Sequence, residues 1–506
     1  MNSAPGTPDL PRRAPDRQWR KDVVHVSPKQ MFRALRHPNY RRWAVADFVS
    51  VTGTWMQNLG LNWFVLTKTG SPGLLGLSLL FQTLPGVVLS GWAGSIADRW
   101  PARRVLLVTQ GLHGVLALFL AVGAWFDAPV STFYALALLG GVVSVFDGPA
   151  LGRFSAQLVS RDDLSNALGI GSVLSSGGRI LGMGIAGALV AATGVPVLFL
   201  INALSFSAVL LAILRVRQSD GIFPLAKSSA AREGVRAGAR YVLSHRPLIV
   251  MFLLSFVLSA LGRNYQVTMA AMSEGQLNAG AVGYSTLSMV FAAGTVVGGF
   301  VAASFKQLTL RLVLVMALGT SLLQIASGTT ASLWSFALTL FPIAVGAVVL
   351  DTATSTRIQL DTDEDMRGRV LAAKAMVTAA SGAVGGPVLG WLSEVSGAGR
   401  ALEVAGITTV LATAAAWLAF AKLKERRAMP ADQRWAQLAP VQLQPADTAK
   451  PVSVPVREKR ATSAARETGR NARPPRGPAW SRPARRLTGR AARKPVAESA
   501  DKPQPT

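Results

Sequence analysis

The eleven residues from Gly94 to Arg104 place one carboxylate and three guanidinium groups between two long apolar segments. The segments at 72–97 and 105–126 contain no Asp, Glu, Lys or Arg. Each is long enough to cross a bilayer of about 30 Å as a helix, because a helix rises about 1.5 Å per residue. Arginines between two such segments hold the turn at the membrane surface. The pattern therefore predicts a membrane-crossing helical hairpin and excludes a soluble globular domain.

The composition of the whole chain is that of a polytopic membrane protein. Of the 506 residues, 50% are hydrophobic and 15% are charged, against about 25% charged residues in soluble domains. The net charge of +26 is carried by the termini and alternate loops, so nucleic-acid binding is the minor interpretation. The chain has no Cys, which excludes disulfides, thiolate metal sites and cysteine nucleophiles. The first 40 residues lack an apolar segment, so we expect no cleavable signal peptide.

Twelve apolar runs follow one another in two groups of six. They lie at about 43–66, 73–97, 105–126, 131–153, 166–192, 196–214, 248–272, 281–304, 311–328, 333–352, 370–393 and 400–421. This grouping predicts two structural repeats related by an axis along the membrane normal. The expected segments are an N-terminal segment 1–41, a six-helix bundle 42–216, a central loop 217–246, a second six-helix bundle 247–423 and a basic tail 424–506.

Lys and Arg gather in the N-terminal segment, the central loop and alternate short loops, which predicts that both termini are cytoplasmic. Within the central loop, 231–243 has the pattern of an interfacial amphipathic helix. The tail is rich in Pro, Arg, Ala and Ser without apolar periodicity, which predicts disorder. The basic loops and tail are expected to attract anionic lipids of the inner leaflet. A merely solvated tail, or one that binds RNA or protein, remains an alternative.

The hairpin loop resembles the signature loop of the major facilitator superfamily, Gly-x-x-x-Asp-Arg-x-Gly-x-Arg-Arg. Pro101 stands where the family usually has Gly, and the matching residues are Gly94, Asp98, Arg99, Arg103 and Arg104. Further stretches resemble the branch of enterobactin-type exporters and transmembrane secretion effectors: Phe32-Arg33, 39–43, Leu158-Val159, 163–167 and 367–370. The resemblance covers about residues 30–423. It implies an all-α fold of twelve transmembrane helices in a bacterial inner membrane, two halves that rock about a midplane cavity, and a gating network that joins Asp98 to Arg153.

A glycine series in the fifth span resembles the antiporter motif of drug and siderophore exporters. It begins at Arg179 and includes Gly182 and Gly187, with Met183 where the motif normally has Pro. Its counterpart in the eleventh span keeps the pair Gly386-Pro387. The resemblance implies proton-driven export. The alternative is that both series only permit close helix packing.

Ionisable groups inside spans are costly, so each suggests a functional or paired structural role. The candidates for proton coupling are Asp47, Asp147 and Asp351. Asp47 either handles protons or caps the start of its helix. Asp147 precedes Gly148-Pro149, which we expect to break the fourth span, and it either pairs with an arginine or lines the cavity. His113 is expected to be a packed polar group rather than a proton carrier.

Polar and large residues in the middle and outer parts of spans predict a wide amphiphilic substrate pocket. The candidates are Trp55, Gln57, Asn58, Asn62, Arg263 and Gln266. A tryptophan near a span end is alternatively an interfacial anchor. The sequence contains no Walker motif, catalytic triad order, metal-spaced His cluster or dinucleotide fingerprint, so we expect no enzyme, cofactor or metal.

The expected function is proton-coupled export of an amphiphilic small molecule of the siderophore or drug type. One alternative is an importer or uniporter of a small metabolite. Another is a non-transporting membrane scaffold whose basic tail recruits a partner. The oligomeric state is open, and a monomer is the simplest expectation.

Overall fold

The computed structural model describes residues 32–97, 100–216, 223, 231–262, 264–305 and 307–428. Side chains are described in these ranges except at 91–97, 231–236 and 424–428. Every helix or strand assigned in these ranges is a helix, which confirms the all-α prediction. The predictions for the N-terminal segment before residue 32 and for the tail after residue 428 lie outside the described residues.

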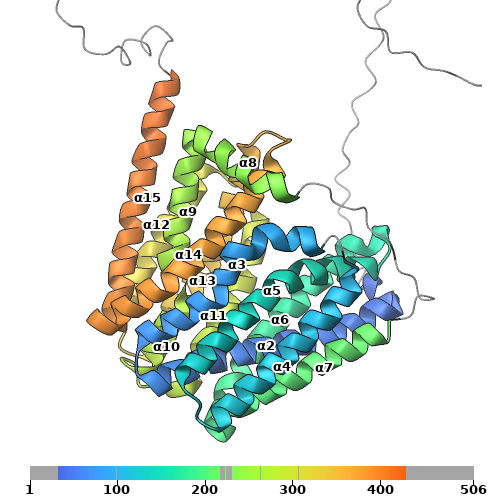
Figure 1. Ribbon diagram of the computed structural model, residues 1–506. Coiled ribbons are helices and arrows are strands. Elements are labelled where there is room, and N and C mark those ends of the chain that lie inside the picture. Colours follow the sequence, from blue (N-terminus) through green and yellow to red (C-terminus); the bar gives the residue numbers. More distant parts are fainter. Residues whose placement is uncertain are drawn as a thin grey trace, which may run out of the picture. The chain divides into compact units, whose positions relative to one another are not determined.

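The first six long helices form the first half (Figure 1). They are α2 (Pro38–Thr69), α3 (Pro72–Ala97), α4 (Ala102–Trp125), α5 (Val130–Gln157), α6 (Leu164–Thr193) and α7 (Val195–Leu214). Short 3-10 turns η1 (Arg33–Arg36) and η2 (Arg161–Asp163) precede α2 and α6. Helix α8 (Ala231–Ser244) lies between the halves in the sequence and covers the segment in which a helix was predicted.

The second half begins at His245. Its helices are α9 (Arg246–Gly262), α10 (Tyr265–Glu274), α11 (Gly280–Ser304), α12 (Leu310–Gly328), α13 (Leu333–Leu360), α14 (Arg367–Ser396) and α15 (Ala398–Ala428). Local signals set several of these boundaries. The Ser332 and Ser335 side chains form a capping box at the start of α13, and Thr309 caps α12 by accepting from the Leu312 N–H.

Two expectations about helix continuity are wrong. The seventh span is not one helix, because it is interrupted between Gly262 and Tyr265, where the Asn264 side chain donates to the Ala260 carbonyl at 2.9 Å. A polar side chain that bonds the backbone in this way competes with the helical ladder. Conversely, α5 continues through Pro149, which was expected to break it. Transmembrane helices tolerate proline because neighbouring groups satisfy the freed backbone carbonyl.

The two halves meet through equivalent helices. The second span α3 packs along the eleventh, α14, and the fifth span α6 packs along the eighth, α11. Numbered within each half, span 2 of one half thus contacts span 5 of the other, in both directions. This reciprocity is what two repeats related by a two-fold axis along the membrane normal produce.

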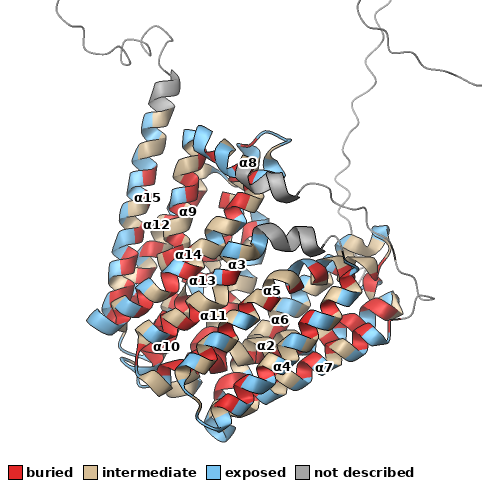
Figure 2. Cartoon of the chain, viewed as in Figure 1, coloured by how far each residue is buried: buried red, intermediate tan, exposed pale blue. Residues whose placement is uncertain are grey.

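Among the described residues, the two halves share a buried core towards one end of the molecule. We call the end that carries Gly70 and Gly397 the Gly70 end, and the end that carries Arg103 and α8 the Arg103 end. One buried cluster joins both halves and includes Trp63, Phe199 and Tyr284. Towards the Arg103 end the described residues form separate cores, one in the first half and two in the second. The halves are therefore packed tightly together at the Gly70 end (Figure 2).

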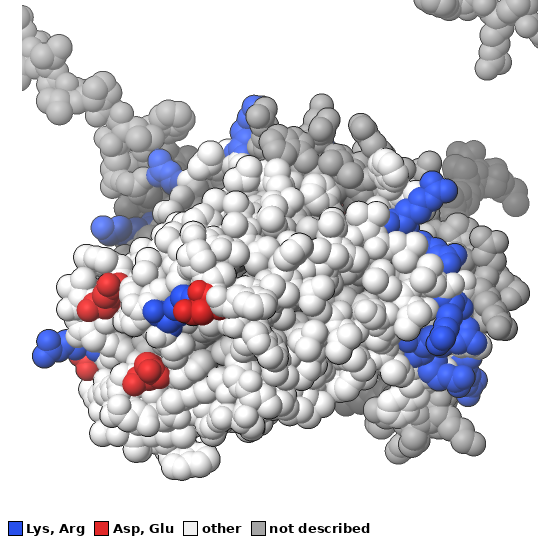
Figure 3. All heavy atoms as spheres, turned by 60° about the horizontal axis from the view of Figure 1, so that its bottom comes forward, with Lys and Arg blue, Asp and Glu red and all other residues white. Residues whose placement is uncertain are grey.

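The surface has the form expected in a bilayer. In Figure 3 a broad uncharged surface separates a group of Lys and Arg at one end from acidic and basic residues at the other. Large apolar side chains are exposed on several helices, among them Phe119, Leu204, Phe300 and Leu338. Within the described residues, 11 helical segments are long and apolar enough to cross a membrane. Helix α2, which packs against α6 and α7, completes the predicted twelve.

Candidate functional site

A polar cavity of about 470 Å³ lies inside the first half. All six long helices of that half contribute to its wall. The polar and ionisable residues of the wall are Asp47, Ser50, Thr54, Gln57, Asn58, Gln82, Thr83, Gln110, His113, Ser144, Asp147, Ser175 and Asn202. Two carboxylates thus face one cavity in a membrane-spanning bundle, and no Lys or Arg is among its described lining residues.

Asp147 is the more buried of the two carboxylates, with 7% of its surface exposed. It accepts a hydrogen bond from the Thr109 hydroxyl at 2.5 Å and from the Gln110 amide at 2.9 and 3.0 Å. Both donors come from α4 and are neutral, and the structure shows no ion pair of Asp147 with a described residue. Of the two predicted roles, the structure supports the cavity-lining one.

Asp47 lies nine residues after the start of α2 at Pro38, about two and a half turns inside the helix. It is too far from the helix start to cap it, so that alternative is wrong. Asp47 lines both the polar cavity and a second cavity of about 390 Å³, which extends past Tyr40 and Trp43 towards the Arg103 end. Among the described residues its carboxylate has no hydrogen-bond or ion-pair partner. Asp47 therefore stands between the polar cavity and the Arg103 end.

The neutral polar residues of the cavity are held by one another. The Asn202 amide donates to Gln57 at 2.9 Å, and the Ser205 hydroxyl donates to Asn202 at 3.0 Å. His113 stacks on Phe206 with ring centroids 5.5 Å apart while it lines the cavity. Sequence reasoning missed Thr109 and Gln110. Their spacing from His113, by four and three residues, places all three on one face of α4 and was the available signal.

Arg179 lies midway along α6, at the boundary between the halves. Its guanidinium donates to the Thr295 hydroxyl on α11 and lies over the Trp55 ring of α2, 5.6 Å from the centroid. Its Nε is buried and has no hydrogen-bond partner. The structure shows no ion pair of Arg179 with a described carboxylate. The described groups that contact this cation at mid-membrane depth, Thr295 and Trp55, are therefore neutral.

The predicted pocket residues separate into two groups. Trp55, Gln57 and Asn58 line the polar cavity. Asn62, by contrast, lies fully buried at the Gly70 end, where its amide is 3.3 Å from the Gln266 side-chain oxygen and 3.3 Å from the Tyr284 hydroxyl. This bridge joins the two halves. The remaining candidate, Arg263, lies outside the described residues.

More contacts join the halves at the Gly70 end. The Glu394 carboxylate of α14 accepts from the Ser71 hydroxyl at 2.7 Å and from the Gly73 N–H at 3.2 Å. A Cβ added at Gly187 would lie 2.7 Å from the Ala281 carbonyl oxygen of α11. One at Gly386 would lie 3.2 Å from the Gly76 carbonyl oxygen of α3. The glycine motifs permit close approach here, and α14 remains helical through Pro387.

Gly182 has the same role within the first half, where α6 meets α2 beside Trp55. Of the gating residues, Asp98 and Arg99 lie outside the described residues, and Gly94 lies near the end of α3. Arg103 is half-buried and donates to the Leu214 carbonyl at 3.2 Å. Arg104 is exposed, and Arg153 is half-buried on α5.

Asp351 has a different environment from the other two candidates. Its carboxylate lies 2.9 Å from the Lys374 ammonium, which also donates to the Ser355 hydroxyl. The Lys374 side chain is 10% exposed and that of Asp351 41%. This carboxylate is compensated by a cation on the neighbouring helix.

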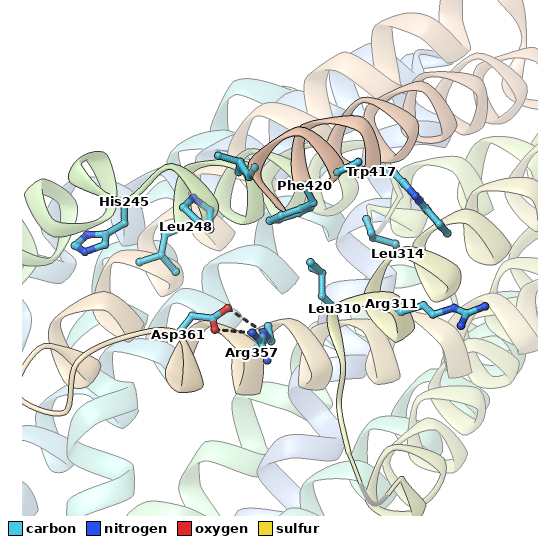
Figure 4. Close-up of a pocket in the computed structure, with 12 residues that line it drawn as sticks. His245, Leu248, Leu310, Arg311, Leu314, Arg357, Asp361, Trp417 and Phe420 are labelled. Atoms are coloured by element: carbon cyan, nitrogen blue, oxygen red, sulfur yellow. Dashed lines mark hydrogen bonds and ion pairs between the residues drawn. The ribbon is translucent and has the colours of Figure 1, made fainter. Parts of the chain in front are cut away.

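A cavity of about 740 Å³ lies in the second half at the Arg103 end, between α9, α12, α13 and α15 (Figure 4). Its wall combines His245 and Arg311 with apolar side chains that include Leu314, Trp417 and Phe420. Figure 4 shows Arg357 and Asp361 facing each other in the wall, joined by hydrogen bonds of 2.9 and 2.7 Å. The Asp361 carboxylate is thus paired with a cation, and the described wall of this cavity contains no acid without such a partner.

Comparisons with known proteins agree with this architecture. Residues 29–466 match the transmembrane secretion effector family. The enterobactin exporter EntS of Shigella boydii is 24% identical over 74% of this chain and 92% of its own length. The staphyloferrin A transporter of Staphylococcus aureus is 32% identical over 33% of this chain, and the match spans only 43% of that transporter.

Among solved structures, the nucleoside transporter NupG matches with a TM-score of 0.62 and 14% identity, over 76% of this chain and 99% of its own. At that identity the likeness shows the fold alone. The match to the family, in contrast, extends over both halves of the chain. The chain therefore belongs to the transmembrane secretion effector family and is a multi-pass membrane transporter with the major facilitator fold.

Proposed function

We propose that this protein is a proton-coupled exporter of an amphiphilic small molecule. The proposal rests on the polar cavity, because Asp47 and Asp147 both line it and no Lys or Arg is among its described lining residues. Two carboxylates in one low-dielectric cavity repel each other, and protonation of either removes that repulsion. Asp47 also lines the cavity that extends towards the Arg103 end, which gives protons a route to this site.

The way in which the halves meet supports alternating access. Their shared core, the Asn62 bridge and the Glu394 contacts all lie towards the Gly70 end. Export requires these contacts to open after the substrate has entered from the Arg103 end. Protonation of the cavity carboxylates supplies a change in charge that biases this equilibrium between states.

The direction and substrate class rest on the relatives. The enterobactin exporter and the staphyloferrin A transporter are named for siderophores, so we propose a siderophore or a drug-like amphiphile as substrate. An importer or uniporter on the same fold is the alternative that the transport assay below distinguishes. A scaffold with a recruiting tail would be favoured if truncation after residue 428 abolished the protein's effect in cells but left substrate flux intact.

The proposed orientation places the Arg103 end and both termini in the cytoplasm of a bacterial inner membrane. The chain has no Cys, so single introduced cysteines can be labelled cleanly in intact cells. An impermeant reagent should label Pro129→Cys at the Gly70 end and leave Asp162→Cys at the Arg103 end unmodified. Both positions are exposed in the structure. Labelling at Asp162→Cys before lysis would contradict the orientation.

In the same orientation the basic loops contact anionic lipids of the inner leaflet, and the cavity of Figure 4 offers Arg311 beside Trp417 for such a headgroup. Arg311→Gln should lower retention of phosphatidylglycerol relative to phosphatidylcholine on the purified protein. Arg400→Gln at the Gly70 end is the matched control and should leave that ratio unchanged.

Transport is tested with the purified protein reconstituted into lipid vesicles in the inside-out orientation. Their acidic lumen corresponds to the cell exterior, so an exporter should accumulate substrate there when a pH gradient is imposed. Metal-free enterobactin, staphyloferrin A and a macrolide form the initial panel. Collapse of the gradient with a protonophore should stop accumulation. Flux that is equal with and without the gradient would exclude coupling, and accumulation only with the opposite gradient would indicate import.

A further inference from the structure

We propose that Arg179, together with Trp55, forms a subsite that binds a carboxylate-bearing aromatic or otherwise flat group of the transported molecule. This inference rests on the proposed function only in that the chain moves an amphiphilic small molecule. It does not depend on proton coupling or on the direction of transport. It assigns the substrate a negative charge, which neither the fold nor the relatives' names supply.

The position of Arg179 is the first argument. It lies near the middle of α6 (Leu164–Thr193), and its partner Thr295 lies near the middle of α11 (Gly280–Ser304). The contact therefore joins the two halves close to the midplane. In transporters built from two repeats, substrate sites lie near the midplane at the repeat interface.

The charge of Arg179 is the second argument. A guanidinium has five N–H donors and stays protonated in proteins. Thr295 accepts from one nitrogen, and Nε is buried without a partner. The contrast with other described cations inside the fold is direct, because Lys374 lies against Asp351 and Arg357 against Asp361. An uncompensated cation at this depth is expensive and functional by default.

The surroundings specify the rest of the ligand. Trp55 lies under the guanidinium and also lines the polar cavity. Ser175, one helical turn before Arg179, lines that cavity as well. Arg179 itself is not among the residues that line the cavity, but its guanidinium adjoins Trp55, which does. A molecule that extends from the cavity past Trp55 can therefore place an apolar group against the indole and an anionic oxygen at the guanidinium. Arginine can donate two N–H hydrogen bonds to the two oxygens of a carboxylate. A neutral amide has one acceptor oxygen and no charge, so it is bound more weakly.

The competing explanation is that Arg179 only ties α6 to α11. In that case removal of the arginine and removal of the Thr295 hydroxyl should have similar consequences. If Arg179 binds the ligand, the two changes should differ, because Thr295→Val frees guanidinium donors while Arg179→Gln removes the charge. Both variants are therefore included in the test.

The experiment measures binding to the full-length purified protein in detergent at equilibrium, without a gradient. The probes are 2-naphthoate and its neutral analogue 2-naphthamide, at matched concentrations, with thermal unfolding and titration as readouts. The wild type should bind naphthoate about ten- to a hundredfold more tightly than naphthamide. Arg179→Gln should lose this preference, Arg179→Lys should keep part of it, and Thr295→Val should keep it fully.

Arg400→Gln is the matched control, since it removes an exposed arginine at the Gly70 end that lines neither cavity, and it should leave the preference unchanged. The proposal is overturned if wild type binds both probes equally, if naphthoate does not bind at millimolar concentration, or if Arg179→Gln keeps the preference. Loss of the preference in Arg311→Gln would move the site to the cavity of Figure 4 and overturn it too. Acetate and inorganic phosphate distinguish an amphiphile site from one for small anions, and their binding as tightly as naphthoate would also contradict it.

The outcome is separable from that for proton coupling. If coupling is wrong, gradient-independent flux will be seen while the naphthoate preference persists. If the Arg179 subsite is wrong, the preference will be absent while gradient-driven flux through Asp47 remains.

Discussion

In the first bundle, Asp47 and Asp147 line a cavity whose described wall contains no Lys or Arg, whereas in the second bundle Asp351 lies 2.9 Å from Lys374. Both bundles are built from six spans and meet through equivalent helices. The two bundles thus share an architecture but differ in whether a cation lies beside their carboxylates. An acid compensated by a buried cation is stable in one protonation state, while an acid with neutral donors is free to change its state. We therefore propose that proton coupling belongs to the first bundle and that the ion pair of the second has a structural role.

The largest expected effect separates the two bundles in one transport assay. Asp47→Asn mimics the permanently protonated carboxyl, so gradient-driven accumulation should fall to the level measured without a gradient. Substrate exchange across the membrane should survive, because the cavity keeps its shape. Asp351→Asn is the matched control and should retain gradient-driven accumulation when activity is compared per amount of folded protein. Normal accumulation by Asp47→Asn would remove the proton role from Asp47 and leave Asp147 as the candidate.

A smaller effect is expected on stability, and in the opposite bundle. Asp351→Asn leaves the Lys374 ammonium buried without its carboxylate, which should destabilise the protein by about 1 to 3 kcal/mol. The double variant Asp351→Asn with Lys374→Met should recover most of that loss, because replacing a whole buried pair is often nearly neutral. Thermal unfolding in detergent measures both. If Asp47→Asn destabilises as much as Asp351→Asn, the proposed difference between the bundles is wrong.

The sequence predicted the all-helical scaffold well because apolar runs depend on local composition. The spans, the helix of the central loop and the close-packing glycines are all features of short segments. The partners of the charges were not predictable, since Lys374 lies 23 residues from Asp351, and Thr109 and Gln110 lie on a different helix from Asp147. The two continuity errors have the same origin. Whether Pro149 breaks a helix, or Asn264 does, depends on neighbours that satisfy the backbone, and these are known only from the fold.

The smallest expected effect concerns the contribution of the second bundle to closing the Gly70 end. Glu394 on α14 accepts hydrogen bonds from Ser71 and Gly73 of the first bundle. Glu394→Gln removes the charge but keeps one acceptor oxygen, so it should weaken the closed state by about 1 kcal/mol. That changes the equilibrium constant between closed and open forms about fivefold.

Spin labels at Pro129→Cys and Ala331→Cys, both exposed at the Gly70 end of opposite bundles, can report this change as a larger population of long distances. Glu274→Gln is the matched control, because Glu274 is exposed at the same end of the second bundle and makes no hydrogen bond or ion pair with a described residue. It should leave the distance distribution unchanged. If both variants shift the distribution equally, the effect is one of surface charge. If only Glu394→Gln shifts it, the second bundle holds the closed state through this carboxylate, and its contribution is distinct from the proton role that Asp47→Asn tests in the first bundle.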